Sequence, residues 1–221
     1  MPYSIIIPIY NEERTLDKLL KSLEQYSHSR NQILIINDGS VDKTNKILKR
    51  YDFIDVLHLK KNYGKGTAIK IGLHNSIHNK TIIYDGDLEL HADGISELMK
   101  LDRVHGIYSL MGTRFNKISP FKSKFEWGNF IFTIFFNLLF KSSHKDILCC
   151  AKAFYKEDLP IKKIDSKGFD IDIELSSFLT KNNRNKIIQV NLKYNRRSIE
   201  DGKKLKISDG WIILKRILFT L

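Results

Sequence analysis

Short apolar runs alternate with amphipathic segments through the first half of the chain. Continuous apolar runs of this length are typical of parallel strands covered on both faces. The predicted strands are residues 4–9, 33–36, 54–59 and 81–84. Apolar positions three or four residues apart predict helices between them, at residues 16–23, 47–51, 67–78 and 94–101. Asn11 and Ser40 stand ahead of the first two helices and are expected to be their N-caps.

The second half of the chain has a different rhythm. The predicted elements are a strand at residues 107–111, a long aromatic helix at 121–140, a strand at 148–154, a helix at 172–181 and a strand at 187–192. Alternating strands and helices favour an α/β fold. We therefore predict a single Rossmann-like domain whose central sheet is mostly parallel.

Two apolar segments are shorter than the about 18–20 residues needed to cross a bilayer. Residues 130–140 suit either a core helix or a helix lying flat in a membrane interface, and both interpretations stay open. Residues 211–221 surround Lys215 and Arg216 with apolar side chains, which favours the interface. We expect a main domain at residues 1–206 and an amphipathic, membrane-associating helix at residues 207–221.

Composition and charge restrict the setting and the partners. The chain has 221 residues, 42% of them hydrophobic, which suits one compact domain. Its net charge of +12 favours nucleotide phosphates, acidic lipids or nucleic acid. Only Cys149 and Cys150 are cysteines, so no disulfide framework or zinc site is expected and a reducing cytosol fits. The first residues lack a basic segment, so no signal peptide is expected.

Polar loops follow three of the predicted strands, at residues 10–13, 37–40 and 85–87. In open α/β sheets, ligands bind beyond the carboxyl ends of the strands. The last loop is Asp85-Gly86-Asp87, and carboxylate oxygens are ligands that Mg²⁺ or Mn²⁺ prefers. Its glycine would let backbone and ligand approach closely. A surface turn is the alternative for this tripeptide alone, but the convergence of three loops favours a metal-bound nucleotide diphosphate site.

Five segments in a fixed order resemble family 2 glycosyltransferases of the GT-A fold, in the branch that makes dolichyl- or polyprenyl-phosphate sugars. They are residues 4–13, 36–44, 62–68 and 85–89, and the pair formed by Gly112-Thr113-Arg114 and Tyr194-x-x-Arg197. The resemblance covers residues 4–210 and identifies residues 1–206 as a GT-A catalytic domain. The loop Asp85-Gly86-Asp87 stands where the family usually has Asp-Ala-Asp.

The resemblance implies a role for individual positions. For the nucleotide pocket it implies Pro8, Tyr10, Asn11 and Glu12, with Asp38 near the base or ribose and Lys65, in a glycine-flanked loop, near the phosphates. For Mg²⁺ or Mn²⁺ it implies Asp85, Asp87 and Glu89. For the phosphate of a lipid acceptor it implies Arg114, Arg197 and Lys203. A carboxylate such as Asp38 can accept hydrogen bonds from ring N–H or ribose hydroxyl groups.

The expected reaction is an inverting transfer of a sugar from a nucleotide-diphosphate sugar. A polyprenyl or dolichyl phosphate acceptor is already ionised and needs no base, whereas a saccharide hydroxyl needs a carboxylate to remove its proton. Asp170 and Asp172 are the candidate bases, with helix capping as the alternative role. The resemblance also implies peripheral contact with the cytosolic face of a membrane, and it leaves open association with a membrane-anchored subunit.

Other classes of protein fit the sequence less well. A sugar nucleotidyltransferase would carry a glycine-rich basic loop after the first strand, and a nicotinamide dehydrogenase would carry Gly-x-Gly-x-x-Gly there. Tyr10-Asn11-Glu12 stands in that place instead. A non-catalytic nucleotide- or nucleic-acid-binding protein would explain the charge, but the ordered acidic loops argue against nucleic acid as a partner.

Overall fold

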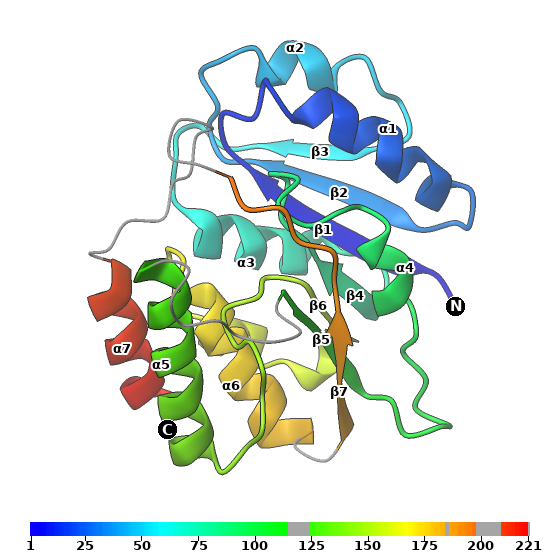
Figure 1. The fold of residues 1–221 in the computed structure, drawn as a ribbon. Helices are drawn as coiled ribbons and strands as arrows, with labels where there is room; N and C mark the ends of the chain where they lie inside the picture. Colours follow the sequence, from blue (N-terminus) through cyan, green and yellow to red (C-terminus); the bar gives the residue numbers. More distant parts are fainter. Residues whose placement is uncertain (115–123, 184–185, 198–208, 221) are drawn as a thin grey trace.

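A computed structural model describes residues 1–114, 124–183, 186–197 and 209–220. The described residues form a seven-stranded sheet in the order β3-β2-β1-β4-β6-β5-β7, with helices on both faces (Figure 1). The strands are β1 (Tyr3–Ile9), β2 (Gln32–Asn37), β3 (Asp55–His58), β4 (Lys80–Ile83), β5 (Ser109–Thr113), β6 (Lys152–Tyr155) and β7 (Ile187–Asn191). Only β6 runs against its neighbours β4 and β5, while the remaining pairs are parallel. The predicted α/β fold with a mostly parallel sheet is confirmed.

The helices are α1 (Leu16–Ser27), α2 (Thr44–Leu48), α3 (Lys65–Asn75), α4 (Gly94–Leu98), α5 (Lys124–Phe140), α6 (Ile171–Asn183) and α7 (Asp209–Phe219), with short 3-10 turns at Lys156–Asp158 and Ile161–Lys163. Strand β6 starts at Lys152, four residues later than predicted, because a turn around Asp146 precedes it, with the Cys149 N–H donating to the Asp146 carbonyl.

The predicted N-caps at Asn11 and Ser40 are wrong. Helix α1 begins after Thr15 and α2 begins after Lys43. Asn11 and Ser40 instead tie the loops after β1 and β2 together. The Asn11 N–H donates to Ser40 Oγ at 2.8 Å, and the Val41 N–H donates to Asn11 Oδ1 at 2.9 Å. Asn11 has a φ of 49°, in the left-handed region that asparagine tolerates best after glycine.

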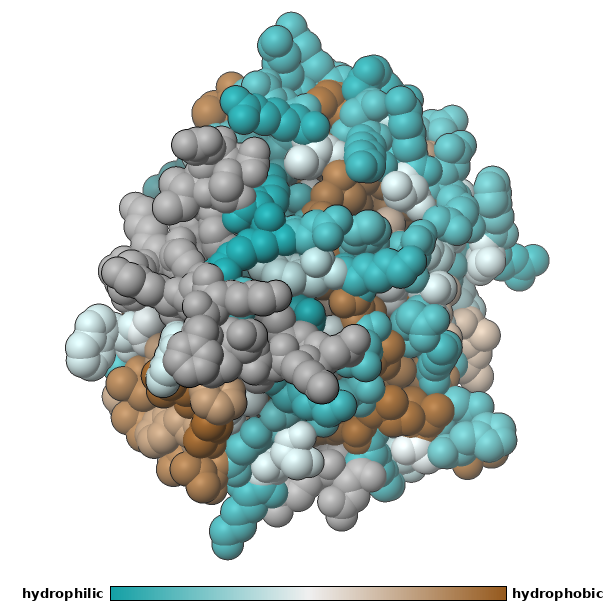
Figure 2. All heavy atoms as spheres, in the orientation of Figure 1, coloured by the Kyte–Doolittle hydropathy of each residue, from teal (hydrophilic) through white to brown (hydrophobic). Residues whose placement is uncertain are grey.

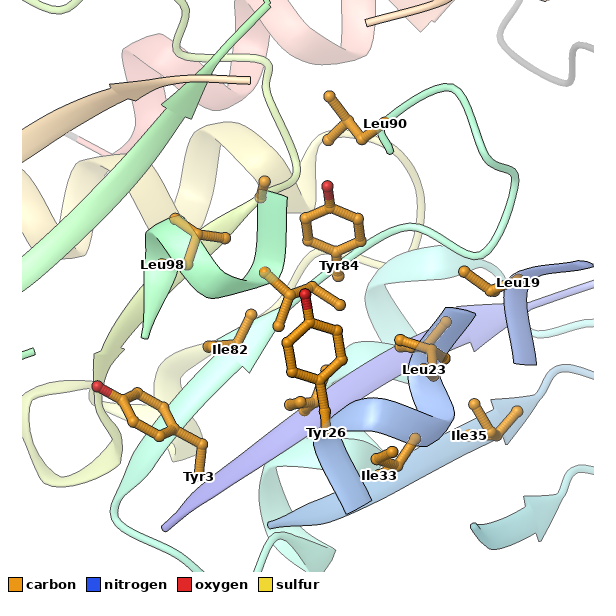
Figure 3. Packing of buried hydrophobic residues seen from close by; sticks show 14 of the residues in the cluster. Tyr3, Leu19, Leu23, Tyr26, Ile33, Ile35, Ile82, Tyr84, Leu90 and Leu98 are labelled. Atoms are coloured by element: carbon orange, nitrogen blue, oxygen red, sulfur yellow. The ribbon is translucent and has the colours of Figure 1, made fainter. Parts of the chain in front are cut away.

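Two apolar clusters cover the two faces of the sheet. On one face α1 packs against β2, with Leu19 and Leu23 facing Ile33 and Ile35 (Figure 3). On the other face α3 and α6 pack against the strands, and Ile6 of β1 belongs to that cluster. Because successive side chains of a strand point to opposite faces, a strand with both faces buried must be apolar at every position. This explains the continuous apolar runs of the first half.

A third cluster joins α5, α6 and α7. Phe136 and Phe140 of α5 pack with Ile213 and Ile217 of α7, and all four side chains are buried. The apolar segment at residues 130–140 is therefore a core helix along one side, while its other side is exposed. No helix within the described residues has the length and hydropathy that crossing a bilayer would require. The expected boundary between residues 206 and 207 lies outside the described residues.

Candidate active site

A cavity of about 540 Å³ opens beyond the carboxyl ends of β1, β2 and β4. Its walls come from the loops after these strands, the starts of α3 and α6, and one side each of α5 and α7. Most of the residues expected to form the site line this cavity: Pro8, Tyr10, Glu12, Asp38, Lys65, Asp85, Asp87, Glu89, Arg114, Asp172 and Arg197. The structure thus brings together side chains that are spread over most of the chain.

Two expected site residues are placed differently, and the placement of a third is not described. Asn11 ties two loops together and does not line the cavity. Asp170 is buried, and its Oδ2 accepts a hydrogen bond from Arg216 Nε at 2.8 Å, outside the cavity wall. Lys203 lies outside the described residues.

Asp38 shapes the loop that precedes α3. Its Oδ1 accepts from the Tyr63 N–H and its Oδ2 from the Gly64 N–H, both at 2.8 Å. Gly64 has a φ of 95°, and a Cβ there would lie 2.3 Å from the Lys167 carbonyl oxygen, so only glycine fits. Lys65 follows as the first residue of α3 rather than as a loop residue, which is a correction to the expectation. Asp38 therefore fixes where the N-terminus of α3 meets the cavity.

Lys65 links the loop Asp85-Gly86-Asp87 to α6. Its Nζ lies 2.9 Å from Asp85 Oδ1 and 3.0 Å from Asp172 Oδ2. Burial opposes the charge of Lys65, but Asp172 and Asp85 together raise the pKa of its ammonium well above the usual value. Burial likewise raises the pKa of Asp85, yet the Lys65 ammonium outweighs it and holds that pKa below the usual value. Both groups are therefore charged at neutral pH.

Asp87 is the less easily ionised member of the acidic pair. Burial, followed by repulsion from Asp85, raises the pKa of Asp87 to about 6. Its Oδ1 accepts from the Glu89 N–H at 3.0 Å, and Arg197 Nη2 lies 3.7 Å from its Oδ2. Glu89 Oε1 accepts from the Arg197 N–H at 3.0 Å. Repelling carboxylates crowded into one cavity are the condition that a bound cation relieves.

The donor set fits a divalent metal in part. Asp85 and Asp87 both line the cavity and offer carboxylate oxygens. Within the described ranges, no group of three histidine, cysteine or acidic side chains is arranged to hold an ion. Mg²⁺ usually takes one or two protein carboxylates and completes its shell with water and phosphate oxygens. The residues present therefore fit a metal that arrives with a diphosphate, and not a metal held by protein ligands alone.

Gly86 has a packing role that was not expected from the sequence. A Cβ at this position would lie 2.4 Å from Ile9 Cγ2 and 3.2 Å from Ile7 Cγ2. The glycine is thus required by packing against β1. Gly86 also lines the cavity, so the expected close approach of a ligand to its backbone stays a prediction.

Arg114, in the cavity wall, forms a buried bidentate ion pair with Asp146. Arg114 Nε and Nη2 each lie 2.8 Å from a different oxygen of Asp146, and the Arg114 N–H donates to Oδ2 at 3.1 Å. Burial opposes the charge of Asp146, but Arg114 outweighs it and lowers the pKa of Asp146 below the usual value. The pair gives the cavity a rigidly oriented guanidinium group.

The sequence analysis missed the contribution of α5 and α7 to the cavity. Glu126 and Asn129 of α5 and Ile213 of α7 line it, and Glu126 pairs with Arg196 at 3.2 Å. The available signal was two polar residues, three positions apart, in an otherwise apolar aromatic helix. Residues three apart share a helix face, so they mark a side of α5 that meets something polar.

Comparison with known proteins gives a family and a fold. The profile of glycosyl transferase family 2 matches residues 4–159. Human dolichyl-phosphate beta-glucosyltransferase is 32% identical over 98 residues, which covers 38% of this chain and 30% of that protein. Undecaprenyl-phosphate 4-deoxy-4-formamido-L-arabinose transferase of Pseudomonas syringae is 35% identical over 120 residues, covering 50% of this chain and 34% of that protein. The chain thus spans about a third of the length of these relatives.

Among solved structures, glucosyl-3-phosphoglycerate synthase from Mycobacterium tuberculosis superimposes with a TM-score of 0.75. The likeness covers 99% of this chain and 79% of that one, at 16% identity, in a complex with Mn²⁺, uridine diphosphate and glucosyl-3-phosphoglycerate. At this identity the likeness shows the fold alone, which is the expected GT-A fold.

Proposed function

The chain belongs to glycosyl transferase family 2, and we propose that it is a metal-dependent, inverting hexosyltransferase that moves a sugar from a nucleotide-diphosphate sugar to a polyprenyl or dolichyl phosphate. One observation carries the proposal. A single cavity at the carboxyl ends of the parallel strands holds the acidic pair Asp85 and Asp87 together with the cations Lys65, Arg114 and Arg197. A site with this mixture of charges suits a metal diphosphate and a second phosphate.

The nucleoside end of the donor fits the loops after β1 and β2. Pro8, Tyr10 and Glu12 line this part of the cavity, next to Asp38. The N-terminus of α3 opens beside them, and backbone N–H groups at a helix N-terminus favour phosphate. The diphosphate is therefore expected between α3 and the acidic pair.

Asp85 and Asp87 would hold Mg²⁺ or Mn²⁺. Bound there with the diphosphate, the metal would neutralise the negative charge that develops on the leaving group. Glu89 would support the site through its hydrogen bond with the Arg197 N–H rather than as a third ligand. Lys65 would add positive charge at the leaving group, because its ammonium is buried beside Asp85.

In the transfer itself, an acceptor oxygen forms a bond to the anomeric carbon on the side opposite the diphosphate, and the bond from that carbon to the diphosphate oxygen breaks. A lipid phosphate is already ionised, so no protein base is needed. Arg114 and Arg197 are the described cations that would hold it, because both line the cavity as guanidinium groups. Lys203 is expected to assist them.

A saccharide hydroxyl is the second candidate acceptor, and Asp172 is the observation that favours it. Its Oδ2 is bound to Lys65, while its Oδ1, buried in the cavity wall, has no hydrogen-bond partner in the described part of the chain. A carboxylate placed in this way could accept a proton from a hydroxyl. Asp170 is the weaker choice because Arg216 holds it outside the cavity wall.

We place the protein at the cytosolic face of a membrane, in peripheral contact. Exposed apolar side chains of α5 and α7 form an apolar patch, which Figure 2 shows as a hydrophobic area where Figure 1 has these two helices. The apolar patch consists of Trp127, Ile131, Ile134 and Leu138 of α5 and of Trp211, Ile212, Leu218 and Phe219 of α7. Exposed Lys215 lies within α7, and basic groups among aromatic ones favour an anionic membrane surface. A membrane-anchored subunit is the alternative occupant of this patch.

The proposed activity is tested by the release of free nucleoside diphosphate from a panel of nucleotide sugars. The panel is run with Mn²⁺, with Mg²⁺ and with a chelator, and with polyprenyl phosphates or free saccharides as acceptors. We expect metal-dependent release with one donor that is accelerated by a lipid phosphate. Acceleration by a saccharide alone would favour the second candidate, and no release with any donor and acceptor would contradict both.

The membrane contact is tested by sedimentation with anionic lipid vesicles. Phe219→Ser in the apolar patch should weaken binding by about tenfold or more, since a buried apolar side chain contributes about 1.5–3 kcal/mol. Val104→Ser is the control, because Val104 is at least as exposed as Phe219 but lies outside the patch. Equal binding of both variants and of the original chain would contradict the contact.

A further inference from the structure

Asn129 is a buried polar residue on the inner side of α5. It is 6% exposed and shares that side with Thr133, Phe136 and Phe140, three or four positions apart. Its Nδ2 donates a hydrogen bond to Asp146 Oδ1 at 2.9 Å. Because an ionised carboxylate only accepts hydrogen bonds, this contact fixes which end of the amide carries the oxygen. The Oδ1 atom is left as an acceptor.

The partner of Asn129 is itself held rigidly. Asp146 is 2% exposed and receives both Nε and Nη2 of Arg114. A side chain whose partner is locked in this way keeps one orientation without a ligand present. Asn129 lines the cavity, and its hydrogen bond to Asp146 fixes the orientation of its amide group.

No donor in the described part of the chain reaches Asn129 Oδ1. Native proteins leave few buried polar atoms unpaired, and such an atom in a cavity wall is expected to meet a ligand. Asp172 Oδ1 is a second unpaired, buried acceptor in the same wall. Thr133 Oγ1, one turn further along α5, is also buried and unpaired, but Thr133 does not line the cavity.

An amide oxygen can meet a hydrogen-bond donor or a metal ion, and the metal is expected at Asp85 and Asp87 instead. Ionised phosphate oxygens supply no hydrogen, which excludes the diphosphate and the phosphate acceptor. Nucleobase N–H groups are expected at the other end of the cavity, beside Pro8, Tyr10 and Asp38. The hydroxyl groups of a sugar next to the diphosphate remain, and Asp172 is joined to that position through Lys65 and Asp85.

We propose that Asn129 is a substrate-contacting residue that selects the donor sugar, with its Oδ1 accepting a hydrogen bond from one hydroxyl group of the transferred hexose and with Asp172 Oδ1 accepting from another. The inference rests on the proposed function and deepens it, because it assigns a residue that recognises the sugar rather than the nucleotide.

The test compares the affinity of nucleotide sugar with that of the corresponding nucleoside diphosphate by calorimetry, so it does not depend on turnover. For Asn129→Ala we expect an about tenfold loss of affinity for the nucleotide sugar, and an unchanged affinity for the nucleoside diphosphate. Thr133→Val is the matched control on the same side of the same helix, and it should change neither affinity.

A series of monodeoxy donor sugars sharpens the test. One deoxy donor should bind the original chain about tenfold more weakly, and Asn129→Ala should bind that donor no worse than the original chain does. If every deoxy donor loses affinity by the same factor in the variant as in the original chain, Asn129 has only a structural role and the inference is overturned. If Asn129→Ala does not fold, Asn129→Leu, which keeps the shape, carries the same comparison.

The outcomes also separate this inference from the proposed function. An equal loss of affinity for nucleotide sugar and nucleoside diphosphate would overturn the role of Asn129 alone. So would unchanged affinity for both. If the original chain binds no nucleotide sugar at all, the proposed function and the inference fail together.

Discussion

The two halves of the cavity are built by different means. The half formed by the loops after β1, β2 and β4 is held by backbone hydrogen bonds, such as those from Tyr63 and Gly64 to the Asp38 carboxylate. The half formed by α5, α6 and α7 is held by buried ion pairs between side chains, such as Arg216 of α7 with Asp170 and Glu174 at the start of α6. Each loop of the first half directly follows a strand of the sheet, which fixes its place, whereas the second half depends on side-chain contacts such as that between Arg216 and Asp170, 46 positions apart.

This difference affects how much a substitution in each half of the cavity destabilises the fold. Removing one partner of a buried ion pair leaves an uncompensated charge, whereas a strand-end loop keeps most of its hydrogen bonds when a single side chain changes. We therefore expect substitutions in the loop half to affect chemistry more than folding, and substitutions in the helical half to affect folding as well.

The largest expected effect is on catalysis in the loop half. Asp87→Ala should reduce turnover by about a thousandfold or more, because the leaving diphosphate would lose its charge stabilisation. The free energy of unfolding should change little, since the variant also removes repulsion from Asp85. Nucleoside diphosphate release and urea unfolding measure the two quantities. Asp52→Asn, at an exposed aspartate outside the cavity, is the control. An active Asp87→Ala variant would refute the metal role.

The next effect is on stability in the helical half. Arg216 is 17% exposed and binds Asp170 at 2.8 Å and Glu174 at 3.4 Å, both of them buried. Arg216→Met should lower the free energy of unfolding by about 3–5 kcal/mol, because two buried carboxylates lose their cation. Urea unfolding followed by circular dichroism measures the change.

Arg50→Met is the matched control for that experiment. Arg50 also pairs with a carboxylate, that of Asp17 at 2.6 Å, but its side chain is 57% exposed. Exposed pairs contribute little to stability, so this variant should unfold almost as the original chain does. Equal destabilisation by both substitutions would contradict the distinction between the two kinds of ion pair.

A smaller effect is expected where the acidic loop packs on β1. Gly86→Ala should cost about 1–3 kcal/mol of stability, because the added Cβ meets Ile9 Cγ2 at 2.4 Å. Ile9→Ala removes that methyl group, so the double variant should be more stable than the sum of the two single changes predicts. Thermal unfolding of the three variants tests this. If the stability changes of the two single variants add up strictly in the double variant, Ile9 is not the side chain that crowds the added Cβ.

The smallest effect is a dependence of stability on pH in the helical half. Burial, and then repulsion from Lys152, lowers the pKa of His144 from its usual 6.5 to about 4. Stability due to neutral His144 is present above about pH 6.5 and is lost as the pH falls towards 4, since the unfolded chain binds the proton first. The loss between pH 7 and pH 5 is about 1–2 kcal/mol. His144→Gln should flatten this part of the stability profile, and an unchanged slope would contradict the assignment.

The same difference decides what the sequence could predict. The strands of the first half and the acidic loops that follow them are local features: a continuous apolar run predicts a strand, and a polar loop at its end predicts a site. Asp85 and Asp87 were therefore expected in the cavity, whereas Lys65 was expected there because of the family resemblance. All three line it.

The helical half could not be predicted in this detail. Asp170 and Asp172 are two positions apart near the start of α6, where residues point about 200° apart around a helix. This spacing shows that only one of the two carboxylates can face the cavity, but it does not show which one. The structure turns Asp172 towards Lys65 and Asp170 towards Arg216, which lies 46 residues further along the chain.

The apolar helix α5 shows a similar limit. Its composition suited either the core or a membrane interface, and each interpretation describes one of its sides. Asn129 adds a third role for α5, which is to form part of the cavity wall. Asn129 is buried there against Asp146. Only the contact with a turn 17 positions away identifies it.

The central claim is that the acidic pair and the neighbouring cations form one site for a metal-bound nucleoside diphosphate. Calorimetric titration of uridine and guanosine diphosphate, with and without Mn²⁺, tests it most directly. We predict that one of the two nucleotides binds tightly only in the presence of Mn²⁺, and that Asp87→Ala removes the effect of the metal. Binding of neither nucleotide, or binding that is indifferent both to Mn²⁺ and to the Asp87 substitution, would contradict the claim.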